Sequence, residues 1–356
     1  NSKDSLDIIY ACTYGNIWRS EDGGYNWNKT LGGNGNHYYT SIKIDSNGTA
    51  YGALSSVYSN TIQKGIWRSE DGINWINILP NNFPSVYGRI SIDINPLNQN
   101  EVYFLCAETT GFGQYTNVFF GGETWTSLWK YTYISGDGSG NGGLWEDLSM
   151  NIPANRPTDF DNFNAQGGYD LIIKIKPDEP NTIFIGGTNL WRSTDGFSSD
   201  SNTTHIGGYF EGSSIGNGNW GSYDNHHPDQ HEILFLPSDP KVLINANDGG
   251  IFKTLNCKKD TVDWISLNNG YQTTQLYSVT TSRNPGSDII LGGFQDNGNF
   301  ITMSSNPTDP WTMPLNGDGA FNAISNDEQN YYISIQRGRI FKMNLDANGS
   351  VNSYNR

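Results

Sequence analysis

One short phrase recurs along this chain, and it constrains the fold more than any other feature. It reads Ser20-Glu-Asp22-Gly-Gly24-Tyr-Asn-Trp27, then Ser69-Glu-Asp71-Gly-Ile-Asn-Trp75, then Ser193-Thr-Asp195-Gly. Each copy follows a Trp-Arg pair, so a strand and its turn are repeated together. Recurrence of a whole supersecondary unit at wide spacing is the signature of a repeat architecture.

The physical content of the phrase is a hairpin turn. The Asp side chain can accept hydrogen bonds from turn amides, Gly supplies positive φ, and the Trp opens the next strand as a core plug. We therefore expect the serines, aspartates, glycine and tryptophans of the three copies to be structural and not catalytic.

Weaker copies of the phrase complete a set of seven. They lie at Ser135, Thr254, Ser304 and Asn344, so that successive anchors are 49, 66, 58, 61, 50 and 40 residues apart. Two further short strand patterns precede most anchors, as in Leu171–Ile175 followed by Thr182–Ile185. Four strands in each repeat are the composition of a propeller blade, so the sequence predicts an all-β, about seven-bladed β-propeller of four-stranded antiparallel blades.

The phrase resembles the Asp-box repeat of sialidases, sortilin-like receptors and family 74 glycoside hydrolases. Two longer segments, 247–254 and 292–298, are similar to the sortilin and xyloglucanase-like branch of that superfamily. The resemblance covers essentially the whole chain and implies the propeller fold much more specifically than it implies an activity.

We expect residues 1–356 to form a single propeller domain, excised from a longer chain, because a core divided among blades suits this length. The first repeat begins at its second strand, near Ile8. Two insertions, 108–128 and 197–220, interrupt the blades. The three cysteines, Cys12, Cys106 and Cys257, are expected to be buried free thiols.

Charge and composition limit the partners. A net charge of −15 disfavours nucleic acid and anionic membrane surfaces, and no apolar run is long enough to span a bilayer. Abundant Gly, Asn, Tyr and Trp resemble secreted or surface proteins of the Bacteroidetes type, many of which use type IX secretion. The sequence favours an extracellular or bacterial cell-surface protein that binds a glycan or a protein partner. Membership of a larger surface assembly is also open.

Candidate site residues gather on the propeller face opposite the repeated turns, where ligands of such proteins commonly bind. We place Asp248, Gln295 and Asp296 there in loops, and Asp170, Asp229 and Asp318 where inner strands begin. Converging carboxylates raise one another's pKa and can serve acid–base chemistry or hold a cation. The alternative, turn aspartates bonded to backbone amides, stays open.

His227-Pro-Asp229-Gln-His231 is the sharpest local signal. Alternation along a strand would point His227, Asp229 and His231 to one face, which suits a transition metal. Imidazoles that only bond to neighbouring loops are the other interpretation. The cofactor expected, if any, is a divalent cation, either calcium or a transition metal.

Aromatic residues of the first insertion, Phe112, Tyr115 and Trp125, are candidates for stacking on sugar rings or partner side chains, or for packing over a blade edge.

A hydrolase needs two carboxylates facing each other across a cleft, and Asp170, Asp229, Asp296 and Asp318 are the candidates. Family 74 enzymes use two propellers around their cleft, and only one is expected here. The leading hypothesis is therefore a noncatalytic binding propeller, and the alternative is a xyloglucanase-like glycoside hydrolase whose second half is missing.

Overall fold

The computed structural model describes residues 7–33, 38–57, 59, 63–118, 122–154, 156–214, 221–270 and 274–356. It divides the chain into two compact units, Asn1–Leu267 and Asn268–Arg356. Within the described ranges the chain is nearly all β, with five short 3-10 turns as its only helical segments. None of these is long and apolar enough to cross a membrane. The predicted all-β class is confirmed.

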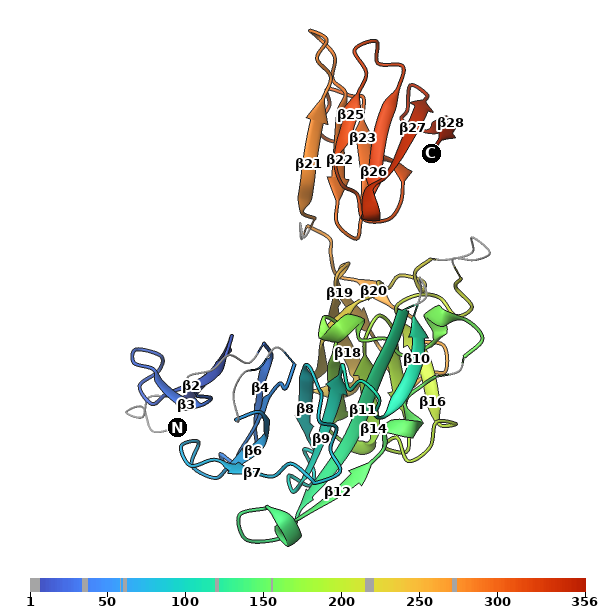
Figure 1. Cartoon of the computed structure of the whole chain (residues 1–356). Helices are drawn as coiled ribbons and strands as arrows, with labels where there is room; N and C mark the ends of the chain where they lie inside the picture. The colour runs from blue at the N-terminus through green and yellow to red at the C-terminus, as the bar shows by residue number, and fades with distance from the viewer. Residues whose placement is uncertain are drawn as a thin grey trace. The chain divides into compact units, whose positions relative to one another are not determined.

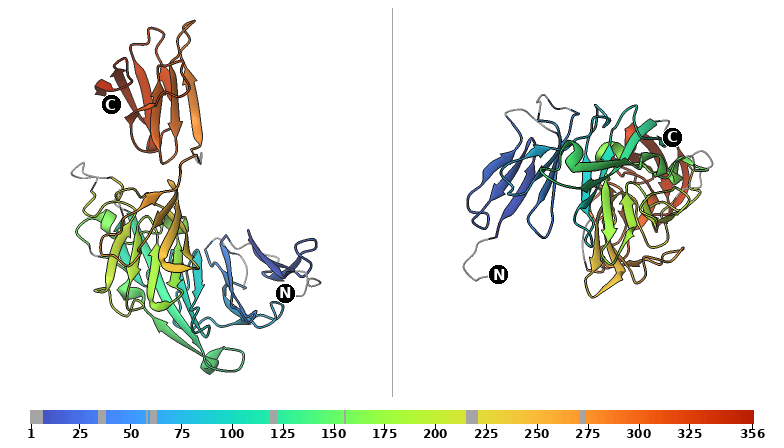
Figure 2. Two further views of the ribbon diagram at one scale, coloured as in Figure 1. Left: turned by 180° about the vertical axis from the view of Figure 1, so that it is seen from behind. Right: turned by 90° about the horizontal axis from the view of Figure 1, so that it is seen from below.

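The first unit contains five antiparallel sheets that follow one another along the chain (Figures 1 and 2, blue to yellow). The first sheet comprises β1 (Ile9–Thr13), β2 (Asn16–Ser20) and β3 (Asn28–Leu31). The second comprises β4 (Thr40–Ile44), β5 (Ala50–Leu54), β6 (Gly65–Ser69) and β7 (Ile76–Asn77). The third comprises β8 (Ile90–Ile94), β9 (Glu101–Ala107), β10 (Gln114–Val118), β11 (Gly122–Tyr133) and β12 (Gly143–Asp147).

The fourth sheet comprises β13 (Ile172–Lys176), β14 (Glu179–Gly186), β15 (Leu190–Ser193) and β16 (Thr203–Gly207). The fifth comprises β17 (Gln230–Leu236), β18 (Asp239–Asn247), β19 (Gly250–Thr254) and β20 (Ile265–Ser266). The 3-10 turns of this unit are η1 (Gly140–Gly142), η2 (Ser149–Asn151), η3 (Asp159–Asp161) and η4 (Gln166–Gly168).

The second unit contains two four-stranded sheets (orange to red in Figure 1). One comprises β21 (Leu276–Thr281), β22 (Ile290–Phe294), β23 (Gly298–Thr302) and β24 (Thr312–Leu315). The other comprises β25 (Asn322–Ile324), β26 (Tyr331–Ile335), β27 (Arg339–Leu345) and β28 (Val351–Asn355), with η5 (Gln336–Gly338) before β27.

The seven sheets match the seven repeats, and each anchor falls within two residues of the end of the strand that the repeat predicts as its third. Ser20, Ser69, Ser193 and Thr254 are the last residues of β2, β6, β15 and β19. Five sheets have the predicted four strands. The first has three, as expected from a repeat that begins at its second strand, and the third has five because the 108–128 segment folds into the β10–β11 hairpin.

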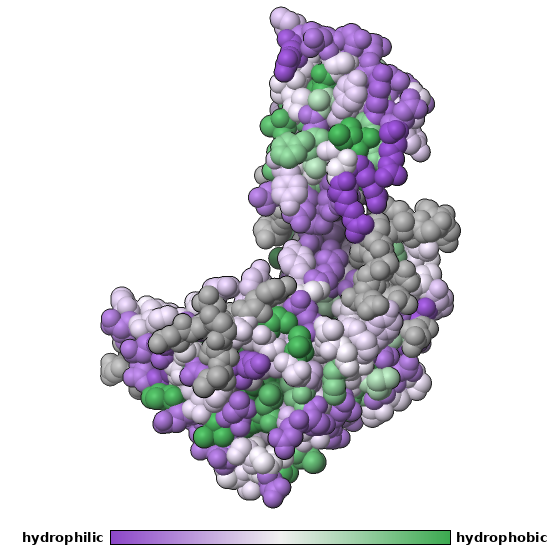
Figure 3. Space-filling model, viewed as in Figure 1, coloured by the Kyte–Doolittle hydropathy of each residue, from purple (hydrophilic) through white to green (hydrophobic). Residues whose placement is uncertain are grey.

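The core is divided among the interfaces between successive sheets. One cluster joins Ile66 of the second sheet to Phe104 and Trp129 of the third, and another joins Leu105 of the third to Ile185 of the fourth. Each sheet therefore buries apolar side chains against its neighbour instead of around one common centre. Hydrophilic residues cover most of the face of each unit seen in Figure 3, with hydrophobic residues in small patches.

Indole N–H groups reinforce these interfaces. In three cases the tryptophan after a turn donates to the fourth-strand region of the preceding sheet: Trp75 Nε1 to Thr30 Oγ1 (3.0 Å), Trp145 Nε1 to the Ile78 carbonyl (2.9 Å) and Trp264 Nε1 to the Ile206 carbonyl (2.7 Å). The prediction of a core plug is wrong for Trp27, which is 38% exposed and donates to the carbonyl of Gly24 in its own turn at 2.9 Å.

The cysteine prediction is partly correct. All three cysteines are free, and Cys106 and Cys257 are buried as expected. Cys12 is exposed, and it lies on β1, which is an edge strand of its sheet among the described strands.

Candidate functional site

Three loops of the first unit meet at one end of the fourth and fifth sheets. They are the η4 loop before β13, the residues just before β17, and the turn between β18 and β19. We use the name mouth cluster for the side chains that these loops and β17 bring together, namely Gln166, Tyr169, Asp170, Asp229, His231 and Asp248.

Asp229 lies at the centre of the mouth cluster and is 7% exposed. It accepts a hydrogen bond from Gln166 Nε2 at 3.3 Å, and it lies close to the carboxyl of Asp170, which is fully buried. Two carboxyl groups are thus buried together at this end of the unit.

The electrostatics of Asp229 agree with this geometry. Burial raises the pKa of Asp229 well above its usual value, and the negative charges of the neighbouring Asp170 and Asp248 raise it further. The nearby His231 opposes this rise. Like charges in a poorly solvated site cannot all ionise, which is how paired carboxyls become proton carriers at neutral pH.

Asp248 forms the more open side of the mouth cluster. Its Oδ1 is paired with Nε2 of His231, and the Tyr169 hydroxyl donates to its carboxylate oxygens at 3.4 Å. The Tyr169 ring meets the His231 ring edge-on, with centroids 5.2 Å apart, and is itself 51% exposed. An exposed aromatic ring thus stands next to a carboxylate.

The backbone around the mouth cluster is held in an uncommon conformation. Gln166 (φ +44°), Asp229 (φ +67°) and Glu108 (φ +57°) occupy the left-handed region without being glycine. Such residues cost about 1 kcal/mol or more each and concentrate at binding and catalytic sites. Two of these residues, Gln166 and Asp229, belong to the mouth cluster.

Arg89 and Tyr39 support the η4 loop from the second and third sheets. Arg89 Nη1 donates to the carbonyls of Gly168 (3.1 Å) and Tyr169 (2.8 Å), and the Tyr39 hydroxyl donates to the Gly167 carbonyl at 3.1 Å. Burial lowers the pKa of Arg89, and the charge of Asp170 counteracts this. These bonds fix the position of Tyr169.

The structure brings together Asp170, Asp229, His231 and Asp248 among the predicted site residues. It does not place His227, Asp229 and His231 on one face of a strand, because β17 begins only at Gln230 and the left-handed φ of Asp229 interrupts the alternation. His227 Nδ1 lies 3.1 Å from the Pro228 carbonyl, whereas His231 turns to Asp248. The three side chains therefore have separate partners.

A divalent cation could be held by a different pair. Oxygen atoms of Asp229 and Asp248 lie within 4.8 Å of each other, which is the spacing at which two carboxylates can share one calcium-sized ion. Binding there would favour the ionised form of Asp229, because a cation and a proton compete for the same carboxylate charge.

The other predicted acids lie in the second unit. The Asp296 amide donates to Asp318 Oδ1 at 3.2 Å, and the Tyr277 hydroxyl donates to Gln295 Oε1. Asp318 thus stabilises the turn in which Asp296 sits, and Asp296 itself has a left-handed φ of +58°.

The predicted aromatic residues of the 108–128 segment belong to the third sheet. Phe112 stacks on Trp129, with centroids 5.6 Å apart and an interplanar angle of 13°, and packs against a core cluster. Tyr115 and Trp125 are cross-strand partners in the β10–β11 hairpin. In the 197–220 segment, β16 forms the fourth strand of its sheet, and residues 215–220 lie outside the described residues.

Sequence reasoning missed Gln166 and Tyr169. Their segment, Gln166-Gly-Gly-Tyr169-Asp170, directly precedes a strand and carries two adjacent glycines. Since Asp170 was already placed at the mouth, the polar and aromatic residues of the same loop could have been placed with it.

The repeated turns use their acids locally. In each of the three turns the serine hydroxyl donates to the aspartate, at 2.8 Å in Ser20–Asp22, 3.0 Å in Ser69–Asp71 and 2.8 Å in Ser193–Asp195. Asn26 donates to Asp22, and Asn74 to Asp71, through both backbone and side-chain nitrogens. Bonds from Asn26 and Ser20 lower the pKa of Asp22 to about 2.

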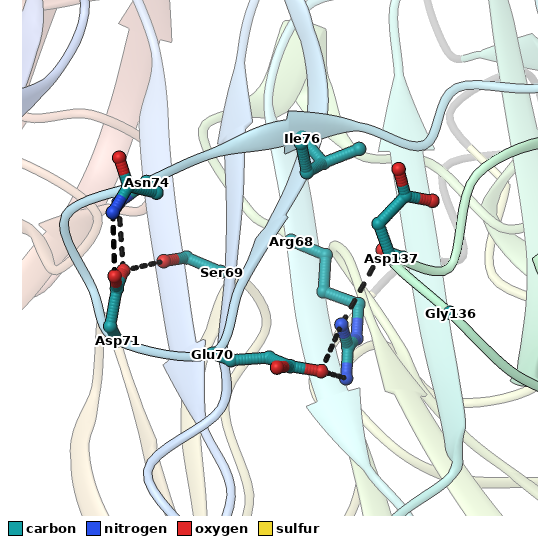
Figure 4. Close-up of a pocket in the computed structure, with 8 residues that line it drawn as sticks. All are labelled: Arg68, Ser69, Glu70, Asp71, Asn74, Ile76, Gly136 and Asp137. Atoms are coloured by element: carbon teal, nitrogen blue, oxygen red, sulfur yellow. Dashed lines mark hydrogen bonds and ion pairs between the residues drawn. The ribbon is translucent and has the colours of Figure 1, made fainter.

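A pocket of about 370 Å³ lies beside the second of these turns (Figure 4). Arg68, 6% exposed, donates to Glu70 at 3.1 Å and to the carbonyl of Asp137 in the next sheet at 3.4 Å, and its guanidinium lies over the Tyr133 ring. Figure 4 shows that Asp71 points to Ser69 and Asn74 instead of into the pocket. Through its bond to the Asp137 carbonyl, Arg68 joins two neighbouring sheets.

No protein-family model matches the chain, and no curated protein matches it. Among solved structures, the chain is similar to a family 74 glycoside hydrolase (GH74) from Niastella koreensis, with 14% identity and a TM-score of 0.50 over 99% of this chain. It spans 55% of that enzyme's chain. YCF48 from Cyanidioschyzon merolae (12% identity, TM-score 0.39, 94% of each chain) and a protein of unknown function from Desulfotomaculum acetoxidans (12%, 0.41, 98% of this chain and 94% of that one) are also similar. The likeness to the Niastella enzyme supports the β-propeller fold.

Proposed function

We propose that this protein is a noncatalytic Asp-box propeller, extracellular or on a bacterial cell surface, that binds a glycan through the mouth cluster. The observation that carries the proposal is the exposed ring of Tyr169 beside the carboxylate of Asp248. An aromatic face suits the C–H face of a sugar ring, and carboxylate oxygens accept hydrogen bonds from its hydroxyls.

The Asp-box identity is supported by the shared bonding of the three turns, in which Ser, Asp and Asn side chains satisfy the same groups. The surface location is supported by the Gly-, Asn- and aromatic-rich composition and the net charge of −15. Both attributions belong to the proposal.

The carboxyl separations favour binding over hydrolysis. Glycosidases place their two carboxyl groups about 5 to 5.5 Å apart for retention or about 6.5 to 9.5 Å apart for inversion. Oxygen atoms of Asp229 and Asp248 lie within 4.8 Å of each other. That separation is shorter than either glycosidase range.

A glycan array followed by calorimetry tests the proposal. Tyr169→Ala and Asp248→Asn should each weaken binding of the best glycan about tenfold or more, whereas Tyr25→Ala, which removes an exposed ring from a repeated turn, should not. Release of reducing sugar from the bound glycan would favour the glycoside hydrolase alternative, which the likeness to the Niastella enzyme suggests. Binding of a protein partner without any glycan would contradict the proposed ligand.

A further inference from the structure

A second pocket, of about 380 Å³, lies in the first unit where first strands of four successive sheets end. Asp170 and Asp229 precede β13 and β17, whereas this pocket is lined by residues at the other ends of those strands, such as Ile175 and Phe235. It is therefore separate from the mouth cluster, and the proposed function does not use it.

The floor of the pocket is built from equivalent positions. An apolar residue occupies the same place near the end of each first strand, namely Ile44, Ile94, Ile175 and Phe235. In the third, fourth and fifth sheets a proline follows two residues later, namely Pro96, Pro177 and Pro237. Proline fixes φ and offers no N–H, so the three prolines form a rigid apolar rim. A volume of several hundred Å³ with mainly apolar walls is typical of a small-molecule site.

Two lysines, Lys43 and Lys174, and two aspartates, Asp45 and Asp93, line this pocket. Asp45 accepts the amides of Asn47 and Thr49 at 2.8 Å in its own turn. Lys43 is paired with Asp93 at 2.9 Å, and the second oxygen of Asp93 accepts the Ile175 amide at 2.8 Å. Lys174 lies 4.0 Å from Glu232, whose side chain is 62% exposed. A pair this long and this solvated is weak, so the Lys174 ammonium retains most of its capacity to bind an anion.

We propose that this pocket binds a small carboxylate that carries an apolar tail. The tail lies on the apolar floor and the proline rim, and the carboxylate pairs with Lys174, with Lys43 nearby. The weakly paired Lys174 ammonium selects the anionic head group, and the apolar walls exclude a purely polar ion.

Calorimetric titration with three probes of equal chain length tests the proposal. Octanoate should bind saturably, and octanol and octylamine should bind about tenfold more weakly or not at all. Lys174→Met should weaken octanoate binding about fivefold or more. Lys241→Met removes a comparable exposed lysine from β18, outside the pocket, and should leave binding unchanged.

A second variant protects the test against misfolding. Leu234 lines the pocket but is 55% exposed, so Leu234→Asp should fold normally while its new charge repels octanoate. The proposal is overturned if octanoate fails to bind, if it binds no better than octanol, or if binding survives both variants. An acidic, apolar peptide that binds where octanoate does not would also overturn it and would identify a protein-docking surface instead.

Discussion

His226 makes the stability of the first unit depend on pH. Its ring is 4% exposed, lies 4.2 Å from the Trp264 ring centroid, and accepts a hydrogen bond from the Gly208 amide through Nδ1 at 2.9 Å. Protonation would remove that acceptor and place a charge in an apolar core. Burial accordingly lowers the pKa of His226 to about 3.

The sign and size of the effect follow from linkage. Above pH 6.5 the ring is neutral in both states, and His226 contributes no pH dependence. Below pH 6.5 the unfolded chain binds a proton that the folded chain refuses, so stability falls until the pH reaches the folded pKa of about 3. At pH 5 the loss is about 2 kcal/mol for this one residue. His205, whose pKa burial lowers to about 4, contributes a similar loss.

Urea unfolding at pH 7.5 and pH 5.0, followed by tryptophan fluorescence, measures the effect. His226→Asn keeps an acceptor for the Gly208 amide but removes the titration, so the stability difference between the two pH values should shrink by about 2 kcal/mol relative to wild type. Ile206→Val, in the same core cluster, should lower stability equally at both pH values. An unchanged pH dependence in His226→Asn would refute the reasoning.

Two further predictions concern the repeats. Trp264→Phe removes the N–H that bonds to the buried Ile206 carbonyl, and it should lower the free energy of unfolding in urea by about 1 to 3 kcal/mol. Trp27→Phe changes an exposed ring and should lower it by less than about 0.5 kcal/mol. Equal losses in the two variants would contradict the interface role of Trp264. Bonds from Asn202 and the neighbouring serines hold the pKa of Asp195 at about 2 despite partial burial, so its stabilisation is present above pH 4 and is lost as the pH falls toward 2. Asp195→Asn should therefore have a lower melting temperature than wild type at pH 7, and this difference in melting temperature should become smaller below pH 4. A difference that does not change with pH would count against this prediction.

The repeat predicted the fold well because its turn chemistry is local. Ser69 and Asp71 satisfy amides within four residues of themselves, so the sequence alone specifies where the third strand ends. Whether each tryptophan is buried does not depend on local sequence alone. Trp27 and Trp264 occupy equivalent positions, yet one is exposed and the other buried, because only the latter packs between two sheets of its unit.

The candidate site was predictable only in part, for the same reason. Strand order placed Asp170, Asp229 and Asp248 at one end of neighbouring sheets, and the structure brings them together. The sequence could not show that Asp229 has a left-handed φ, which breaks the alternation from His227 to His231. Nor could it show that Tyr169 meets Asp248, since that contact joins residues 79 positions apart.

A crystal structure with the best glycan from the array tests the central claim most directly. The account predicts an intact glycan with one sugar ring against Tyr169 and a hydroxyl donating to Asp248. A glycan bound only elsewhere, or cleaved between the carboxyl groups of the mouth cluster, would contradict it.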